Sequence, residues 1–111
     1  MRGFKQKNFL DYIPQKNKEV PWDVDEQGIV TLHIEHRGMF AVLAQKLFGK
    51  PRISHVTLER IGSFLWQQVD GQKSIFDLAK VLHREFGNEA EPLYERLVPY
   101  MQNLYQLGYL K

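Results

Sequence analysis

The four histidines are the clearest candidates in this chain for metal or acid–base chemistry. His33 and His36 lie three residues apart on an expected strand, where odd spacings place side chains on opposite faces. They therefore cannot easily share an ion. His55 and His83 stand alone, with no Asp or Glu nearby at a repeated ligand spacing. We expect surface or half-buried histidines rather than ligands, and hence no metal site and no cofactor.

Nucleophilic chemistry is equally poorly supported. Ser54, Ser63 and Ser74 lie in no G-x-S-x-G turn, and Ser74 has a helix-capping role available. The acidic residues of 23–26 form a turn cluster, which favours solvated carboxylates over an acid–base pair. The chain has no cysteine, and no glycine-rich phosphate loop is present. We therefore predict that it has no catalytic residues and is not an enzyme.

Composition describes a small folded domain without a strong charge. The chain has 111 residues, of which 43% are hydrophobic and 25% charged, with a net charge of +2. This length predicts one domain over 1–111, and the charge is too small to indicate nucleic acid as a partner. No apolar run is long enough to cross a membrane, and no secretory signal precedes the domain. We expect a cytoplasmic protein.

Extended segments dominate the first half. Trp22 and Val24 share one face of a first strand, and 25–28 supply turn residues. Apolar residues at alternate positions of 30–34 then predict the second strand of an antiparallel hairpin. Ile53–Thr57 is expected to be the third strand. Residues 1–18 are expected to form an N-terminal arm.

Helical periodicity appears at four places. Apolar spacing over Met39–Phe48, followed by Gly49, predicts a short extra helix at 39–49, between the second and third strands. A second helix follows Leu58, and a third begins at Ser74, which forms a capping-box pattern with Asp77. The last begins near 91–92, where a proline is tolerated, and runs to Gly108.

The last helix carries an apolar face that is wider than one core contact needs. Besides the core arc through Leu93, Leu97 and Tyr100, a neighbouring stripe follows helical spacing and comprises Tyr94, Val98, Met101 and Tyr105. The stripe either packs on the hairpin or the extra helix, or lines a groove for a partner. Pro99 is expected to disturb this helix at mid-length.

Two other function classes fit the same elements. Three helices with a small sheet also describe a winged-helix DNA-binding regulator, and an apolar patch would suit an oligomerising structural subunit. Base readout requires clustered Arg, Lys, Asn or Gln on one helix, whereas around the last helix Glu89, Glu91 and Glu95 surround Arg96. The sequence therefore favours no nucleic-acid partner.

The second half resembles a known family. Its marks are Leu58-x-x-Ile61-Gly62, Trp66 ahead of Asp70-Gly71, Ser74-Ile75 with Leu78-Ala79, and Leu104-x-x-Leu107-Gly108. With these features, which span about half of the chain, it resembles the pyrroloquinoline quinone (PQQ) synthesis protein D, or PqqD-like, family.

This resemblance implies an α+β, winged-helix-like fold, with a three-stranded antiparallel sheet followed by three helices. It also implies a non-catalytic recognition element that binds the leader of a ribosomally synthesised precursor peptide. The module would present that peptide to a modifying enzyme, often a radical S-adenosylmethionine protein. The leader would add as a strand to the sheet edge, against the last helix. The expected peptide-binding residues are Ile53, His55, Val56, Thr57, Tyr94, Val98, Met101 and Tyr105.

The chain also departs from short family members. The helix at 39–49 and the arm at 1–18 are extra, and their apolar residues would cover the cleft, dock the enzyme or form a dimer. A homodimer through the sheet edge or through Met39–Phe48 is therefore a further alternative. The product, PQQ or another peptide-derived compound, stays open.

Overall fold

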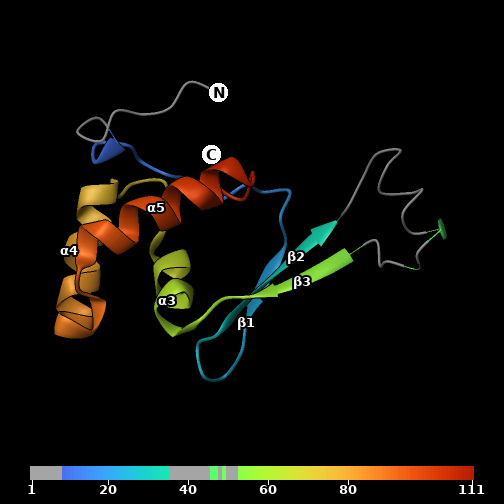
Figure 1. Ribbon diagram of the computed structural model, residues 1–111, viewed down its shortest axis with the longest axis horizontal. Coiled ribbons are helices and arrows are strands. Elements are labelled where there is room, and N and C mark those ends of the chain that lie inside the picture. The colour runs from blue at the N-terminus through green and yellow to red at the C-terminus, as the bar shows by residue number, and fades with distance from the viewer. Residues whose placement is uncertain (1–8, 36–45, 48, 50–52) are drawn as a thin grey trace.

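The computed structural model describes residues 9–35, 46, 47, 49 and 53–111. Its elements, in chain order, are β1 (Trp22–Val24), β2 (Val30–Glu35), β3 (Ile53–Thr57), α3 (Arg60–Gln68), α4 (Ile75–Phe86), the 3₁₀ turn η1 (Gly87–Ala90) and α5 (Leu93–Gln106). The strands precede the helices, and β2 and β3 project beyond the helices as a wing (Figure 1). The prediction of a three-stranded antiparallel sheet followed by three helices is confirmed.

The hairpin turn forms where the sequence predicted it. Gly28 has a φ of +82°, a region that glycine enters without strain. The Asp25 carboxylate accepts hydrogen bonds from the amides of Gln27 and Ile29, both at 2.9 Å. The resulting β1–β2 register places Trp22 opposite Leu32, and the β2–β3 register places Leu32 opposite Val56. These three residues share the face of the sheet that is turned to the core.

A buried serine joins that face to the first helix. Val30 and Leu32 are fully buried, and so is Ser63 of α3. The Ser63 hydroxyl accepts a hydrogen bond from the Val30 amide at 2.9 Å and donates one to the Leu58 carbonyl at 3.1 Å. Because a buried polar group without partners costs free energy, this arrangement lets Ser63 occupy the core without penalty. Ser63 is therefore a structural residue that positions α3 against β2 and the end of β3.

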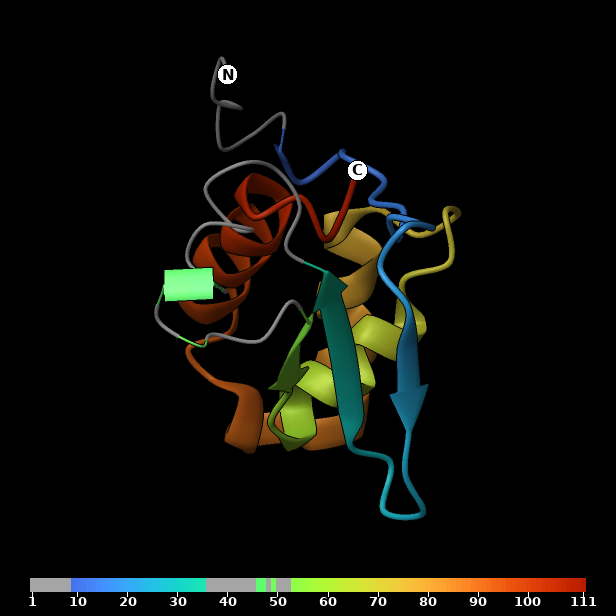
Figure 2. The same ribbon diagram turned by 90° about the vertical axis from the view of Figure 1, so that its right-hand side faces the viewer.

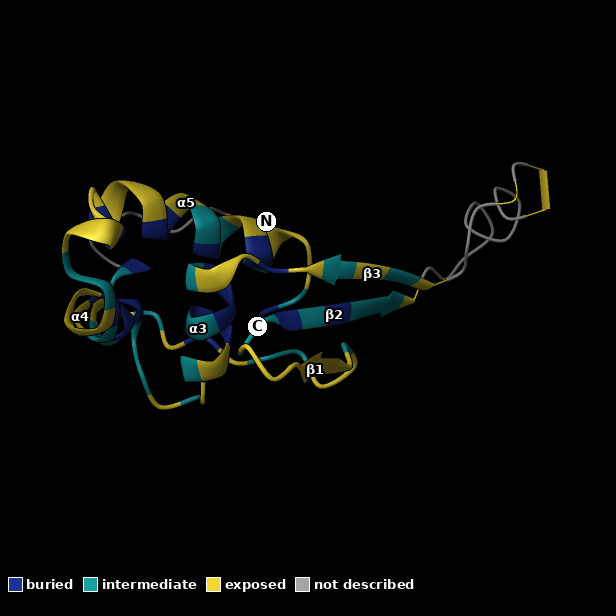
Figure 3. Cartoon of the chain, turned by 90° about the horizontal axis from the view of Figure 1, so that it is seen from below, coloured by how far each residue is buried: buried dark blue, intermediate teal, exposed yellow. Residues whose placement is uncertain are grey.

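The helix α4 begins with the predicted capping box. The Ser74 hydroxyl accepts from the Asp77 amide at 3.1 Å, and the Asp77 carboxylate accepts from the Ser74 amide at 3.0 Å. Gly87 follows the helix with a φ of +56°. The core beneath the helices is one cluster to which all three contribute, as the buried inner faces in Figure 3 show.

The described part of the N-terminal arm belongs to the core. Phe9 is fully buried, and the carbonyls of Leu10 and Tyr12 accept from the first amides of α4. Those amides have no partner within the helix, so the arm supplies the acceptors they lack. Further along, Gln15 and Lys111 exchange backbone hydrogen bonds at 2.9 and 2.7 Å. Residues 9–17 therefore lie along α4 and the C-terminal residues rather than along β3 (Figure 1).

Burial of the arm predicts a loss of stability in alkali. Desolvation, and next the proximity of Tyr105, raise the pKa of Tyr12 from 10.0 to about 12. An unfolded Tyr12 ionises near pH 10, so stability is complete below pH 10 and falls as the pH rises towards 12. Denaturant titrations between these values should show a smaller loss for Tyr12→Phe than for the parent. The matched variant Tyr94→Phe, at an exposed position of α5, should lose as much stability as the parent. If the free energy of unfolding fell equally with pH in all three proteins, the loss could not be assigned to Tyr12.

Two expectations about helices have different outcomes. The extra helix over Met39–Phe48 lies almost wholly outside the described residues, and of that range only Lys46 and Leu47 are described. The expected disturbance at Pro99 does not end the last helix, because α5 runs through Pro99 from Leu93 to Gln106. The proline lies at an exposed position, on the solvent side of the helix.

Candidate functional site

The open edge of β3 is the first part of the candidate site. The strand order is β1-β2-β3, so β3 has a neighbour on one side, and no other described strand pairs with its outer side. Figures 2 and 3 both show β3 on the side of the sheet where α5 lies, with β1 on the far side. An unpaired edge exposes a row of amides and carbonyls that can pair with another extended chain.

Sheet register determines which residues of β3 offer these groups. The Leu58 amide donates to the Val30 carbonyl at 2.8 Å, and hydrogen-bonded pairs alternate along an antiparallel ladder. The backbone groups of Ser54 and Val56 therefore point to β2. Those of Ile53, His55 and Thr57 point to the open edge. A proline at Val56 would consequently break the β2–β3 ladder, whereas one at His55 would remove an amide from the open edge.

Two histidines meet on the outer face of the sheet. His33 of β2 and His55 of β3 are direct partners in the register, and their Nδ1 atoms are 2.8 Å apart. His33 Nε2 lies 2.7 Å from the Asp23 carboxylate of β1. The expectation that His55 stands alone is thus wrong, since the contact depends on pairing between strands that are distant in sequence. The same face also holds a Thr31–Thr57 hydroxyl contact at 3.3 Å.

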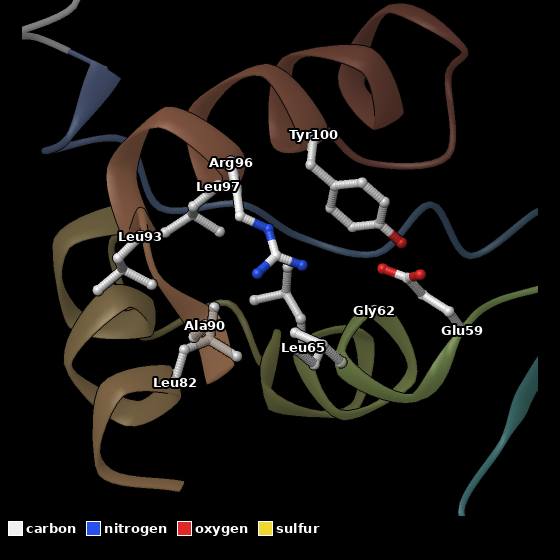
Figure 4. A pocket seen from close by; sticks show the side chains of 10 residues that line it. Glu59, Gly62, Leu65, Leu82, Ala90, Leu93, Arg96, Leu97 and Tyr100 are labelled. Carbon is white, nitrogen blue, oxygen red and sulfur yellow. The ribbon is translucent and has the colours of Figure 1, made fainter. Parts of the chain in front are cut away.

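A pocket of about 290 Å³ opens where β3 leads into α3. Glu59, two residues after β3, stands at one end of it. Its floor is apolar and comes from four elements, and Arg96 of α5 extends across it (Figure 4). The apolar lining consists of Ile61, Leu65, Leu82, Ala90, Leu93 and Leu97. The pocket therefore combines an apolar interior with polar groups at its mouth, a composition typical of binding sites for partly apolar ligands.

The polar end of the pocket depends on a glycine. A Cβ at Gly62 would lie 2.5 Å from the Tyr100 hydroxyl oxygen, so the absence of a side chain at Gly62 lets the hydroxyl end of Tyr100 approach α3 this closely. Figure 4 shows the hydroxyl directed towards Glu59. Burial, and next the Glu59 carboxylate, raise the pKa of Tyr100 above its ordinary value. Tyr100 accordingly stays neutral at physiological pH and can donate a hydrogen bond.

The stripe singled out on α5 lies on a different side of the helix from this pocket. Val98 and Met101 are buried core residues, exposed by 5% and 1%. Tyr94 faces α4, where it lines a shallow depression with His83, and Tyr105 contacts Tyr12 of the arm edge to face, with ring centroids 5.7 Å apart. None of these four lines the pocket beside β3, so their contact with a peptide stays a prediction. Val98→Asp would place a charge in the core and would test folding rather than binding.

Arg96 and Tyr100 are the candidate residues that the sequence reasoning missed. With Leu93 and Leu97 they follow the i, i+3, i+4, i+7 spacing of one helical face. Tyr100 had been assigned to the core arc, and Arg96 had been weighed only as a contact to nucleic acid. The glycine at 62 was a usable signal, because a glycine inside a helix commonly marks the close approach of another group.

Other classes of site find no support among the described residues. No group of three or more acidic, histidine or cysteine side chains there is arranged to hold a metal ion. The Asp23–His33–His55 contacts form a line rather than surround a common point. In the same part of the chain, no helix is both long and apolar enough to span a lipid bilayer.

Comparison with known proteins adds one finding. A family model described as coenzyme PQQ synthesis protein D matches residues 28–110, which is well over half of the chain and includes β2, β3, α3, α4 and α5. The match begins after β1, so the arm and the first strand lie outside it. Searches of curated proteins and of solved structures gave no match.

Proposed function

The chain belongs to the coenzyme PQQ synthesis protein D (PqqD) family, and on this premise we propose that it is a non-catalytic peptide-binding module. It binds the leader of a ribosomally synthesised precursor peptide and holds it for a modifying enzyme, of the radical S-adenosylmethionine class. The product is PQQ or a related peptide-derived compound.

One observation carries the proposal: the open edge of β3 lies on the side of the sheet where α5 lies, and an apolar pocket between α3 and α5 opens just after β3 ends. A leader segment would pair with the outward backbone groups of Ile53, His55 and Thr57, which supplies affinity for any extended chain. Its side chains would then alternate between the outer face of the sheet and the side of the helices. A large apolar side chain on the helical side would enter the pocket between α3 and α5. Selectivity would come from that pocket and from the side chains of β3.

Polar groups at the pocket mouth would orient the peptide. Arg96 also donates to the Glu89 carbonyl at 2.9 Å, so its guanidinium is held across the apolar floor. The neutral hydroxyl of Tyr100 stands at the other end, beside Glu59. A peptide that places an apolar side chain in the pocket would thus find both a cation and a hydrogen-bond donor within reach of its own carbonyls.

Binding can be tested without knowing the natural leader. A displayed library of random linear peptides, selected on the full-length protein, supplies the probe, and the selected peptide is titrated while backbone amide shifts are followed. We expect perturbations at 53–57 and at the residues that line the pocket. A selected peptide that leaves both regions unperturbed would refute this site.

A proline on the open edge of β3 should weaken peptide binding. His55→Pro removes an amide that faces the open edge and should weaken the selected peptide more than tenfold, while the β2–β3 ladder survives because it does not use that amide. Val24→Pro is the matched control, since by the register of β1 and β2 its amide faces the opposite edge of the sheet. Calorimetric titration should show that this variant binds the selected peptide with the affinity of the parent. Equal affinity of both variants would contradict strand addition at β3.

A second copy of the chain is the competing occupant of this edge. Pairing of two β3 strands would make sedimentation depend on protein concentration, and His55→Pro would remove that dependence. A dimer that dissociates when the selected peptide is added would place both partners on the same edge.

A further inference from the structure

We propose that the Asp23–His33–His55 chain makes the open edge of β3 select a strand that carries Lys or Arg opposite His55. The inference rests on the proposed function, since it concerns which peptide the edge prefers. It starts from the outer face of the sheet, which the backbone pairing and the pocket leave unused.

Hydrogen-bond chemistry determines the tautomer of each ring. An ionised carboxylate only accepts hydrogen bonds, so the His33 Nε2 that lies 2.7 Å from Asp23 must carry a proton. In a neutral His33, Nδ1 is then an acceptor. The His55 Nδ1, 2.8 Å away, must therefore donate to it. One proton remains for each ring, and His55 Nε2 is left with a bare lone pair.

Ring geometry directs this lone pair to the open edge. The two nitrogens of an imidazole point to nearly opposite sides, and His55 Nδ1 is directed to His33 on β2. Nε2 therefore faces away from β2, and His55 is exposed. Among the described residues, His55 Nε2 has no hydrogen-bond or ion-pair partner. The sheet thus presents a hydrogen-bond acceptor at the position where a fourth strand would lie.

Local charge favours a cationic donor over a neutral one. By strand alternation, the titratable residues on this face are Asp23 on β1 and His33 and Glu35 on β2, with His55 alone on β3. None of the three strands contributes Lys or Arg to the face. With both histidines neutral, the Asp23–His33–His55 chain carries one net negative charge, that of the Asp23 carboxylate. Lys or Arg on the added strand would donate to Nε2 and be attracted by this carboxylate, whereas Asp or Glu would meet a lone pair and like charge.

Register places one peptide side chain beside His55. Because the backbone groups of His55 face the open edge, the residue opposite it on an antiparallel added strand forms a hydrogen-bonded pair with it. Directly opposite residues direct their side chains to the same face of a sheet. The selectivity is therefore confined to a single position of the peptide.

The tautomers can be measured in the free protein. Long-range ¹H–¹⁵N spectra near pH 8 should show His33 as the Nε2–H form and His55 as the Nδ1–H form, the minor tautomer of free histidine. Asp23→Ala removes the carboxylate that fixes the tautomer of His33 and, through it, that of His55, so His55 should shift towards the Nε2–H form. Finding His55 as Nε2–H in the parent would overturn the proposal.

Peptide variants test the selectivity itself. In the selected library peptide, the residue opposite His55 is located by cross-strand nuclear Overhauser effects and replaced by Lys, Leu or Glu. Near pH 8 we expect Lys to bind about two- to fivefold more tightly than Leu, and Glu more weakly by a similar factor. In His55→Leu the spread should shrink. An unchanged spread, or no preference for Lys in the parent, would overturn this inference and leave strand addition standing. A library that yields no peptide reaching β3 would overturn both.

Discussion

Replacing Trp66 with alanine is expected to lower the free energy of unfolding by about 3–5 kcal/mol. Trp66 lies on α3, is exposed by 1% and packs edge to face against Trp22, with ring centroids 6.3 Å apart. A domain of this size is stable by only about 5–15 kcal/mol, so the loss is a large fraction of the total. Urea titration followed by circular dichroism measures it.

Trp66→Phe separates the contribution of aromatic packing from any contribution of the indole nitrogen. Among the described residues, Trp66 Nε1 is buried without a hydrogen-bond partner, so phenylalanine forfeits no hydrogen bond there. The change keeps most of the apolar volume and should cost only about 1–2 kcal/mol, from the smaller ring. An alanine variant with the same urea midpoint as the parent would show that α3 does not pack on the sheet as described.

Removing the Phe9 ring should destabilise the protein about as much as a core substitution in the helices. Phe9 is fully buried and its ring lies 5.7 Å from that of Tyr12, so Phe9→Ala is expected to cost about 3–5 kcal/mol. Ile13→Ala is the matched control, because Ile13 lies in the same arm but is 45% exposed. It should cost less than about 0.5 kcal/mol. Both values come from the same urea titrations.

This result would also decide what the arm does. If the arm competed with a ligand at the β3 edge, Phe9→Ala would tighten peptide binding and leave the unfolding midpoint in place. The described contacts of residues 9–17 instead connect the arm to α4 and to the C-terminal residues. Deleting the arm would therefore remove part of the core and could not serve as a test of competition.

Local signals explain why most of the fold could be predicted. The limits of β3 and the box of Ser74 and Asp77 matched the structure, because alternation and capping act within a few residues. The stripe on α5 shows the limit of such signals. Helical periodicity groups residues on a face, but it does not state which neighbour that face meets. The arm and α4 contact part of the stripe, whereas the pocket is lined by the adjacent face of α5, which carries Arg96 and Tyr100.

Contacts between distant segments could not be predicted in the same way. The pairing of His33 with His55 requires the register of two strands that are joined through 36–52, and no local pattern specifies it. The approach of Tyr100 to Gly62 requires the crossing of α3 and α5. Both contacts belong to the candidate site. The use of a sheet edge was expected only from the family resemblance, which implies that a leader adds there as a strand.

Along β3, the residues whose side chains support the fold alternate with those whose side chains are available to a bound peptide. Ser54 and Val56 pair with β2 and direct their side chains to the core side, whereas His55 and Thr57 have exposed side chains on the outer face. Substitutions at His55 and Thr57 should therefore change the free energy of unfolding little, whereas substitutions at Ser54 and Val56 should lower it. Substitutions at His55 and Thr57, whether by evolution or by design, could therefore change which peptide this edge prefers while the fold is kept.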